Sequence, residues 1–125
     1  MTDDQRQYYY DMKDRGRAYL SIDDDGHIAA IVTFFIGNDD NKYLYGRDPW
    51  TVLEDEPDGE TVYIDQLIAH GNLKKEIYQQ FKNVLTDIKN KFTNVKQAKW
   101  VRAPAGFRKH KIREGKPNVH CKNIA

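Results

Sequence analysis

Apolar positions recur along the chain with two different periods, which predict both strands and helices. Residues 17–22 alternate apolar and polar side chains, and residues 27–36 are rich in Ile, Val, Thr and Phe, as strands are. The turn at residues 23–26 joins them as a β-hairpin, whose second strand we expect to be central and buried on both faces. Residues 61–69 predict a third strand, which carries the polar Asp65 at its middle.

Helical spacing marks two further segments. Between residues 73 and 92, apolar side chains follow one another at intervals of three and four, which predicts a long amphipathic helix. The stripe consists of Leu73, Ile77, Phe81, Val84, Leu85, Ile88 and Phe92. A shorter helix is expected over residues 4–13, with Tyr8, Tyr9 and Met12 on one side.

The last third of the chain completes the predicted sheet. Residues 96–102 predict a fourth strand, and the strand–helix–strand order predicts that it pairs parallel to the third. Residues 107–113 predict a fifth, highly basic strand at an edge. The predicted fold class is α/β, or α+β by stricter naming: one domain over residues 1–125 with a single mixed sheet. It comprises an N-terminal helix (1–16), a core (17–113) and a tail (114–125).

Charge is distributed unevenly along the chain, although the net charge is only +1. Residues 1–65 hold 16 acidic and 6 basic side chains, whereas residues 66–125 hold 3 acidic and 14 basic ones. The total excludes a uniformly basic nucleic-acid protein and an acidic disordered one. The asymmetry indicates an anionic partner for the second half, or two halves that neutralise each other in the folded protein.

Cysteine usage and hydropathy bear on location and on metal binding. Cys121 is the only cysteine, no apolar signal segment opens the chain, and the near-apolar run at residues 28–36 is too short to span a bilayer. We therefore expect a cytoplasmic protein without a membrane partner, located in the host cytoplasm or the virion if it is phage-encoded. His27, His110 and His120 have no ligand spacing with Cys121, so no metal site is expected.

The junction between the third strand and the long helix concentrates the candidate chemistry. Asp65 is a candidate catalytic or orienting carboxylate, with an ion-pair partner of Arg102 or a lysine as the structural alternative. His70 lies beside the helix start and is a candidate general acid or base. The first amides of a helix lack intrahelical partners and attract phosphate groups. The candidate donor-binding residues are Gly71, Asn72, Leu73, Lys74 and Lys75.

A second candidate surface follows the fourth strand. Its anion- or partner-contacting residues are Arg102, Arg108, Lys109, Lys111 and Arg113. The mixture of basic and aromatic residues favours contacts with a nucleic-acid backbone, and it equally suits an edge strand protected by charge. The consecutive tyrosines 8–10 cannot all point inward from one helix, which indicates a protein partner or a homo-oligomer.

Several stretches carry a family resemblance. Residues 47–50 (RDPW) contain an Asp-Pro pair, and residues 63–71 (YIDQLIAHG) lead from strand to helix. Residues 98–102 (AKWVR) and 111–116 (KIREGK) form a basic ending. With the order of elements, these stretches make residues 17–116 resemble the GNAT acyltransferase fold. The resemblance is closest to the lysine acyltransferases that activate RTX toxins, although residues 69–73 (AHGNL) replace the usual GNAT pyrophosphate loop.

The resemblance implies a function and a site. Asp65 matches the family's catalytic aspartate, and acyl-CoA or acyl carrier protein is the implied acyl donor, with no permanently bound cofactor. The family's catalytic histidine lies in the N-terminal segment, whereas residues 1–26 here contain no histidine. We expect a small acyltransferase-type protein that moves an acyl group from a thioester donor to an amine. Two alternatives stay open: a non-catalytic GNAT-like structural or docking protein, for example a phage virion component, and a nucleic-acid-binding module.

Overall fold

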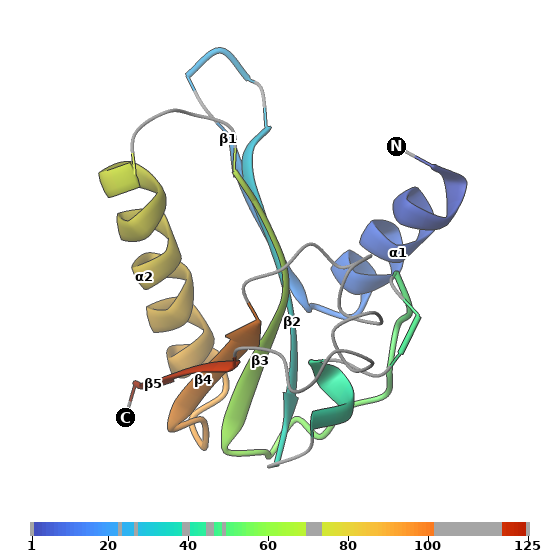
Figure 1. Cartoon of the computed structure of the whole chain (residues 1–125). Helices are drawn as coiled ribbons and strands as arrows, with labels where there is room; N and C mark the ends of the chain where they lie inside the picture. Colours follow the sequence, from blue (N-terminus) through green and yellow to red (C-terminus); the bar gives the residue numbers. More distant parts are fainter. Residues whose placement is uncertain are drawn as a thin grey trace.

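The computed structural model of the chain consists of a single mixed sheet, two α-helices and a short 3-10 helix (Figure 1). The strands are β1 (Ala18–Ile22), β2 (Ile28–Gly37), β3 (Thr61–Ala69), β4 (Gln97–Val101) and β5 (Val119–Asn123). The helices are α1 (Asp3–Asp14), α2 (Lys74–Lys91) and the short 3-10 helix η1 (Asn41–Tyr43). The structure describes residues 2–22, 24–26, 28–38, 41–44, 47–48, 50–69, 74–101 and 119–124.

The strands lie side by side in chain order, β1-β2-β3-β4-β5. The neighbours β1 and β2, β2 and β3, and β4 and β5 are antiparallel, whereas β3 and β4 are parallel. The predicted hairpin and the predicted parallel pair on either side of the long helix are therefore confirmed, and so is the α+β class with one mixed sheet.

The two faces of the sheet bury different side chains because successive residues of a strand point in opposite directions. In β2, Val32, Phe34 and Ile36 join the cluster under α2, while Phe35 joins the cluster under α1. Figure 1 shows α2 and α1 on opposite sides of the sheet. As predicted, β2 is central and buried on both faces from residue 32 to residue 36.

Each helix is fixed to its face by its own apolar side. Phe81, Leu85 and Ile88 of α2 are buried in the first cluster, three members of the predicted stripe. Helix α1 buries Tyr8 and Met12, and it begins with a capping box between Thr2 and Gln5. The helix predicted over residues 4–13 corresponds to α1, and the helix predicted between residues 73 and 92 corresponds to α2.

The loop before β3 packs directly on the end of β2. The Glu56 amide donates to the Ile36 carbonyl oxygen over 2.8 Å. A Cβ added at Gly59 would lie 2.5 Å from the backbone of Gly37, a distance that only glycine permits.

One prediction about the C-terminal region is wrong. Residues 119–123, which fall in the predicted tail, form β5 at the edge of the sheet, antiparallel to β4. Backbone pairing and the stacking of His120 on Trp100, with ring centroids 5.8 Å apart, hold the strand in place. The strand predicted over residues 107–113 lies outside the described residues.

Candidate functional site

A β-bulge in β3 turns two polar side chains toward α1. Thr33 pairs with Gln66 while Phe34 pairs with Ile64, so Asp65 is the extra residue on β3. Because Gln66 is paired with Thr33, it shares the α1 face with Asp65. Both residues are buried, Asp65 at 1% exposure and Gln66 at 7%. The acid that the sequence placed in mid-strand is thus a bulge residue aimed into the protein.

Asp65 binds two side chains that come from distant parts of the chain. One carboxylate oxygen accepts a hydrogen bond from the Tyr8 hydroxyl of α1, and the other pairs with the Arg47 guanidinium. Arg47 also donates to the carbonyl oxygen of Thr51 over 3.2 Å, and its guanidinium lies 5.5 Å from the Phe35 ring centroid. The ion pair therefore joins β3, α1 and the loop after η1.

The hydrogen bonds next to Asp65 form a linear chain that ends at its carboxylate. The backbone N–H of Gln66 donates to the Thr33 hydroxyl over 3.1 Å, and the Thr33 and Tyr8 hydroxyl oxygens lie 2.6 Å apart. Since Tyr8 donates to Asp65, its oxygen accepts from Thr33. Hydrogen bonds in such a chain polarise one another in a low-dielectric interior, which strengthens the final hydrogen bond from Tyr8 to Asp65.

Burial and the Asp65 charge set the protonation state of Tyr8. Loss of solvation raises the pKa of the Tyr8 phenol far above its ordinary value, and the negative charge of Asp65 and the hydrogen bond to it raise it further. Thr33 and Arg47 oppose the shift, and the net direction is upward. Tyr8 therefore stays a neutral hydrogen-bond donor to Asp65 through the physiological pH range.

Three donors at this network are buried without a partner among the described residues: Nε of Arg47, Nε2 of Gln66 and the hydroxyl of Tyr9. Arg47 pairs with Asp65, Gln66 follows it in the chain, and the charge of Asp65 contributes to the raised pKa of Tyr9. Buried donors of this kind are uncommon, and they leave the site with unused capacity to hold an acceptor oxygen.

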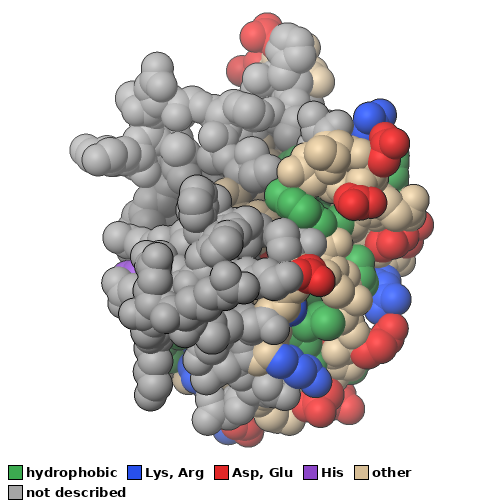
Figure 2. Space-filling model, turned by 45° about the vertical axis from the view of Figure 1, so that its right-hand side comes forward, with side chains coloured by type: hydrophobic (Ala, Val, Ile, Leu, Met, Phe, Trp, Pro, Cys, Tyr) green, Lys and Arg blue, Asp and Glu red, His purple; other side chains and the backbone are tan. Residues whose placement is uncertain are grey.

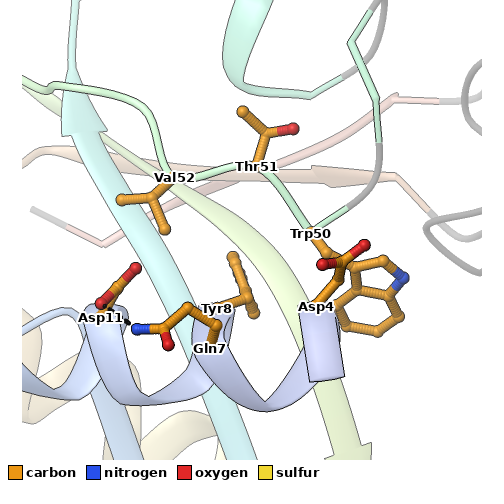
Figure 3. A pocket seen from close by; sticks show the side chains of 7 residues that line it. All are labelled: Asp4, Gln7, Tyr8, Asp11, Trp50, Thr51 and Val52. Carbon is orange, nitrogen blue, oxygen red and sulfur yellow. Dashed lines mark hydrogen bonds between the residues drawn. The ribbon is translucent and has the colours of Figure 1, made fainter. Parts of the chain in front are cut away.

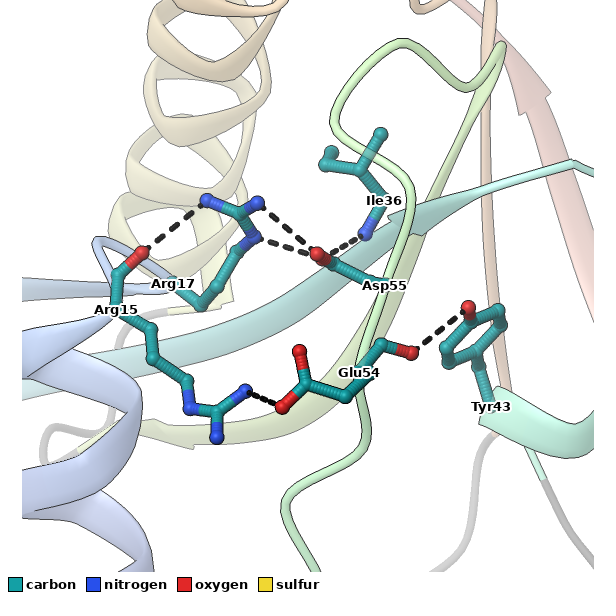
Figure 4. A network of polar contacts seen from close by, with 6 residues as sticks. All are labelled: Arg15, Arg17, Ile36, Tyr43, Glu54 and Asp55. Atoms are coloured by element: carbon teal, nitrogen blue, oxygen red, sulfur yellow. Dashed lines mark hydrogen bonds and ion pairs between the residues drawn. The ribbon is translucent and has the colours of Figure 1, made fainter.

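A second polar network anchors the acidic loop (Figure 4). Arg17 donates to both oxygens of Asp55, over 2.7 and 3.0 Å, and Asp55 also accepts from the Ile36 amide over 2.8 Å. Arg15 pairs with Glu54 over 2.9 Å. These acids are neutralised by arginines of the same half of the chain, so this part of the charge asymmetry is resolved locally.

A pocket of about 330 Å³ opens between α1 and the segment at residues 50–52 (Figure 3). Its lining consists of Asp4, Gln7, Tyr8, Asp11, Trp50, Thr51 and Val52. Trp50 adopts a left-handed backbone with φ 63°, an unfavourable conformation for a residue other than glycine. An edge contact of its indole with Tyr8 and a tilted contact with Tyr9, with centroids 5.7 and 5.9 Å apart, hold it there.

Most of the site residues predicted from sequence lie outside the described part of the chain. These are His70, Gly71, Asn72, Leu73, Arg102, Arg108, Lys109, Lys111 and Arg113. Lys74 and Lys75 form the start of α2, as expected for a helix that begins after the junction. Asp65 is described and forms an ion pair with Arg47. Arg102, the partner suggested by the sequence, lies outside the described residues.

Sequence reasoning did not assign Tyr8, Thr33 or Arg47 to the site. Arg47 is the first residue of the RDPW stretch, and its place in that motif is the feature of the sequence that could have assigned it to the site. Within the described residues, no group of three or more His, Cys, Asp or Glu side chains is arranged to hold a metal ion. In the same part of the chain, no helix combines the length and the hydropathy needed to span a membrane.

Comparisons with protein-family models, with characterised proteins and with solved structures found no match to this chain.

Proposed function

We propose that this chain is an acyltransferase-type protein with a GNAT-like fold, which transfers an acyl group from a thioester donor to an amine. The observation that carries the proposal is the position of Asp65, a buried carboxylate on the bulge of β3 that binds Tyr8 and Arg47. Within the described residues the parallel register of β3 with β4 runs from Thr61 and Gln97 to Ile64 and Trp100.

The candidate chemistry lies where this register ends. Asp65 directly follows Ile64, and α2 begins a few residues after β3 ends. In the proposed reaction the amine nitrogen attacks the thioester carbonyl, the C–N bond forms, and the C–S bond breaks. The thiolate leaves and takes a proton from solvent. Asp65, through the Tyr8 hydroxyl, accepts the proton that the amine loses. Tyr8 comes from the N-terminal segment, where the resembling family carries its histidine.

Donor binding is tested first, by thermal stabilisation with acyl-CoA and with acyl carrier protein. Substituting Lys74→Ala and Lys75→Ala should weaken the stabilisation, because both residues lie in the first turn of α2. Lys91→Ala, at the other end of the same helix, removes an equal charge and should leave it unchanged. Absence of stabilisation by any thioester donor contradicts the proposal.

Acyl transfer is tested next, with mass spectrometry of an amine acceptor after incubation with the donor. Asp65→Asn keeps the shape of the side chain and removes its charge, so transfer should fall by about 100-fold or more if Asp65 accepts a proton. The folded state of the variant is checked by circular dichroism. Equal transfer by a folded Asp65→Asn protein removes Asp65 from the mechanism.

A second function is favoured by a different observation. The Asp65 side chain is 0% exposed, as suits a structural network, and several apolar side chains are exposed. They are Tyr10 at 61%, Leu20 at 55%, Leu67 at 45% and Val119 at 36%. A non-catalytic docking protein predicts self-association or a copurifying protein partner. A monomer by light scattering with no partner contradicts it.

A further inference from the structure

The pocket beside α1 has a lining that suits a cation on a hydrocarbon chain. Two of its lining residues are carboxylates, Asp4 and Asp11, and none is basic. Its remaining surface includes the indole of Trp50, the Tyr8 ring and the Val52 side chain. Figure 3 shows Asp4 beside Trp50 at one end and Asp11 with Gln7 at the other, and Tyr8 lies between them.

The spacing of the carboxylates defines an elongated site. Asp4 and Asp11 are seven residues apart on α1, which puts them on one side of the helix and about 10 Å apart along its axis. Asp11 is held by a hydrogen bond from Gln7 of 2.9 Å, so one end of the groove is ordered before a ligand arrives. A volume of about 330 Å³ is in the range of small-ligand sites.

The walls of the pocket complement the apolar part of such a ligand. The Trp50 indole is fixed by an edge contact to Tyr8 and a tilted contact to Tyr9, and aromatic faces attract ammonium groups. Arg47, from the loop that carries Trp50, does not neutralise the pocket, because it donates to Asp65 and to the carbonyl oxygen of Thr51. Figure 2, which brings the right-hand side of Figure 1 forward, shows acidic side chains with some basic ones among them around small apolar patches.

We propose that this pocket binds an alkylammonium group. Its methylene chain lies along Trp50, Tyr8 and Val52. A diamine places one ammonium at Asp4 and the other at Asp11, and a lysine side chain places its single ammonium at one of them. Two sources share this chemistry, a free polyamine and the lysine side chain of a partner polypeptide. The proposal does not depend on acyl transfer: a protein without acyltransferase activity can bind an ammonium here, and an active one can lack the site.

The test follows the indole N–H of Trp50 by ¹⁵N NMR. The chain has two tryptophans, and Trp50→Phe assigns the two indole signals. The probes are 1,5-diaminopentane and a short lysine-containing peptide, and the same peptide with its lysine acetylated is the neutral control. A charged probe should shift the Trp50 signal in a saturable way and leave that of Trp100 in place. Tighter binding of the diamine identifies a free polyamine as the ligand, and tighter binding of the peptide identifies a lysine side chain of a partner.

Variants make the test specific to the pocket. Asp4→Asn and Asp11→Asn should each weaken binding about threefold, and the double variant about tenfold. Asp14→Asn removes the same charge from the exposed end of α1, outside the lining, and should keep the affinity within about twofold. The proposal is overturned if neither charged probe shifts the Trp50 signal, if the acetylated peptide binds as well, or if the Asp4 and Asp11 variants bind like the parent protein.

Discussion

The two faces of the sheet are built from different chemistry. Under α2 the buried cluster consists of aliphatic and phenylalanine side chains, among them Phe34, Leu85 and Ile88. Under α1, aromatic rings surround the paired charges of Asp65 and Arg47 with hydroxyl groups between them. Both faces use residues of the same strands, β2 and β3, so the alternation of a strand divides one sheet into two environments.

This difference predicts that the face under α2 tolerates substitutions better than the face under α1. Apolar packing is non-directional, so a core of this kind accepts substitutions that keep its volume. A buried polar network is directional, and each member that is removed leaves another unsatisfied. The α1 face therefore specifies one arrangement of α1, β3 and the loop, and this rigidity suits a site that must hold a carboxylate in place.

The largest expected effect is on the α1 face, at Asp65. Asp65→Ala leaves the Arg47 charge buried without its partner and the Tyr8 hydroxyl without its acceptor. Breaking a buried ion pair in this way costs about 3–5 kcal/mol of the free energy of unfolding. Urea denaturation monitored by circular dichroism measures the loss.

The control for this prediction is an exposed acid. Asp58→Ala, in the loop before β3, should change the free energy of unfolding by less than about 0.5 kcal/mol. An Asp65→Ala protein that keeps the parent's denaturation midpoint would show that the network adds nothing to stability, and the contrast between the faces would fail.

The next effect is on the α2 face, at Ile88, which is 0% exposed. Ile88→Ala removes buried methylene groups and leaves a cavity, at a cost of about 3 kcal/mol, whereas Ile88→Val costs about 1 kcal/mol. The same denaturation measurement gives both values. The graded series is the signature of a volume-dependent core. If Ile88→Val lowered the free energy of unfolding as much as Ile88→Ala, the volume dependence of this core would be contradicted.

The sequence predicts the α2 face better than the α1 face, for a physical reason. Helical spacing places Phe81, Leu85 and Ile88 on one side of a helix, and such a pattern is local. The partners of Asp65 are not local: Tyr8 lies 57 residues away and Arg47 lies 18 away. Their meeting depends on tertiary packing and on a bulge, which no periodicity reveals.

The edge strand β5 was missed for another reason. Three of its five side chains are exposed, and its residues are largely polar, so alternation of apolar side chains is weak. Its place is set by backbone pairing with β4. Asp65 itself could be identified as a candidate because a carboxylate is unusual in an apolar strand, although the sequence did not show which side chain would pair with it.

The smallest expected effect is a dependence of stability on alkaline pH that originates on the α1 face. Burial, and then the charge of Asp65, raises the pKa of Tyr9 to about 12. An unfolded tyrosine ionises near pH 10, so between about pH 10 and 12 the unfolded chain binds fewer protons than the folded one. Stability from Tyr9 is complete below that range and is lost as pH rises through it.

The decline in the free energy of unfolding from pH 9 to 11 should be shallower for Tyr9→Phe than for the parent protein. Tyr10→Phe, whose ring is 61% exposed, should follow the parent. Equal slopes in all three proteins would show that folding does not raise the pKa of Tyr9.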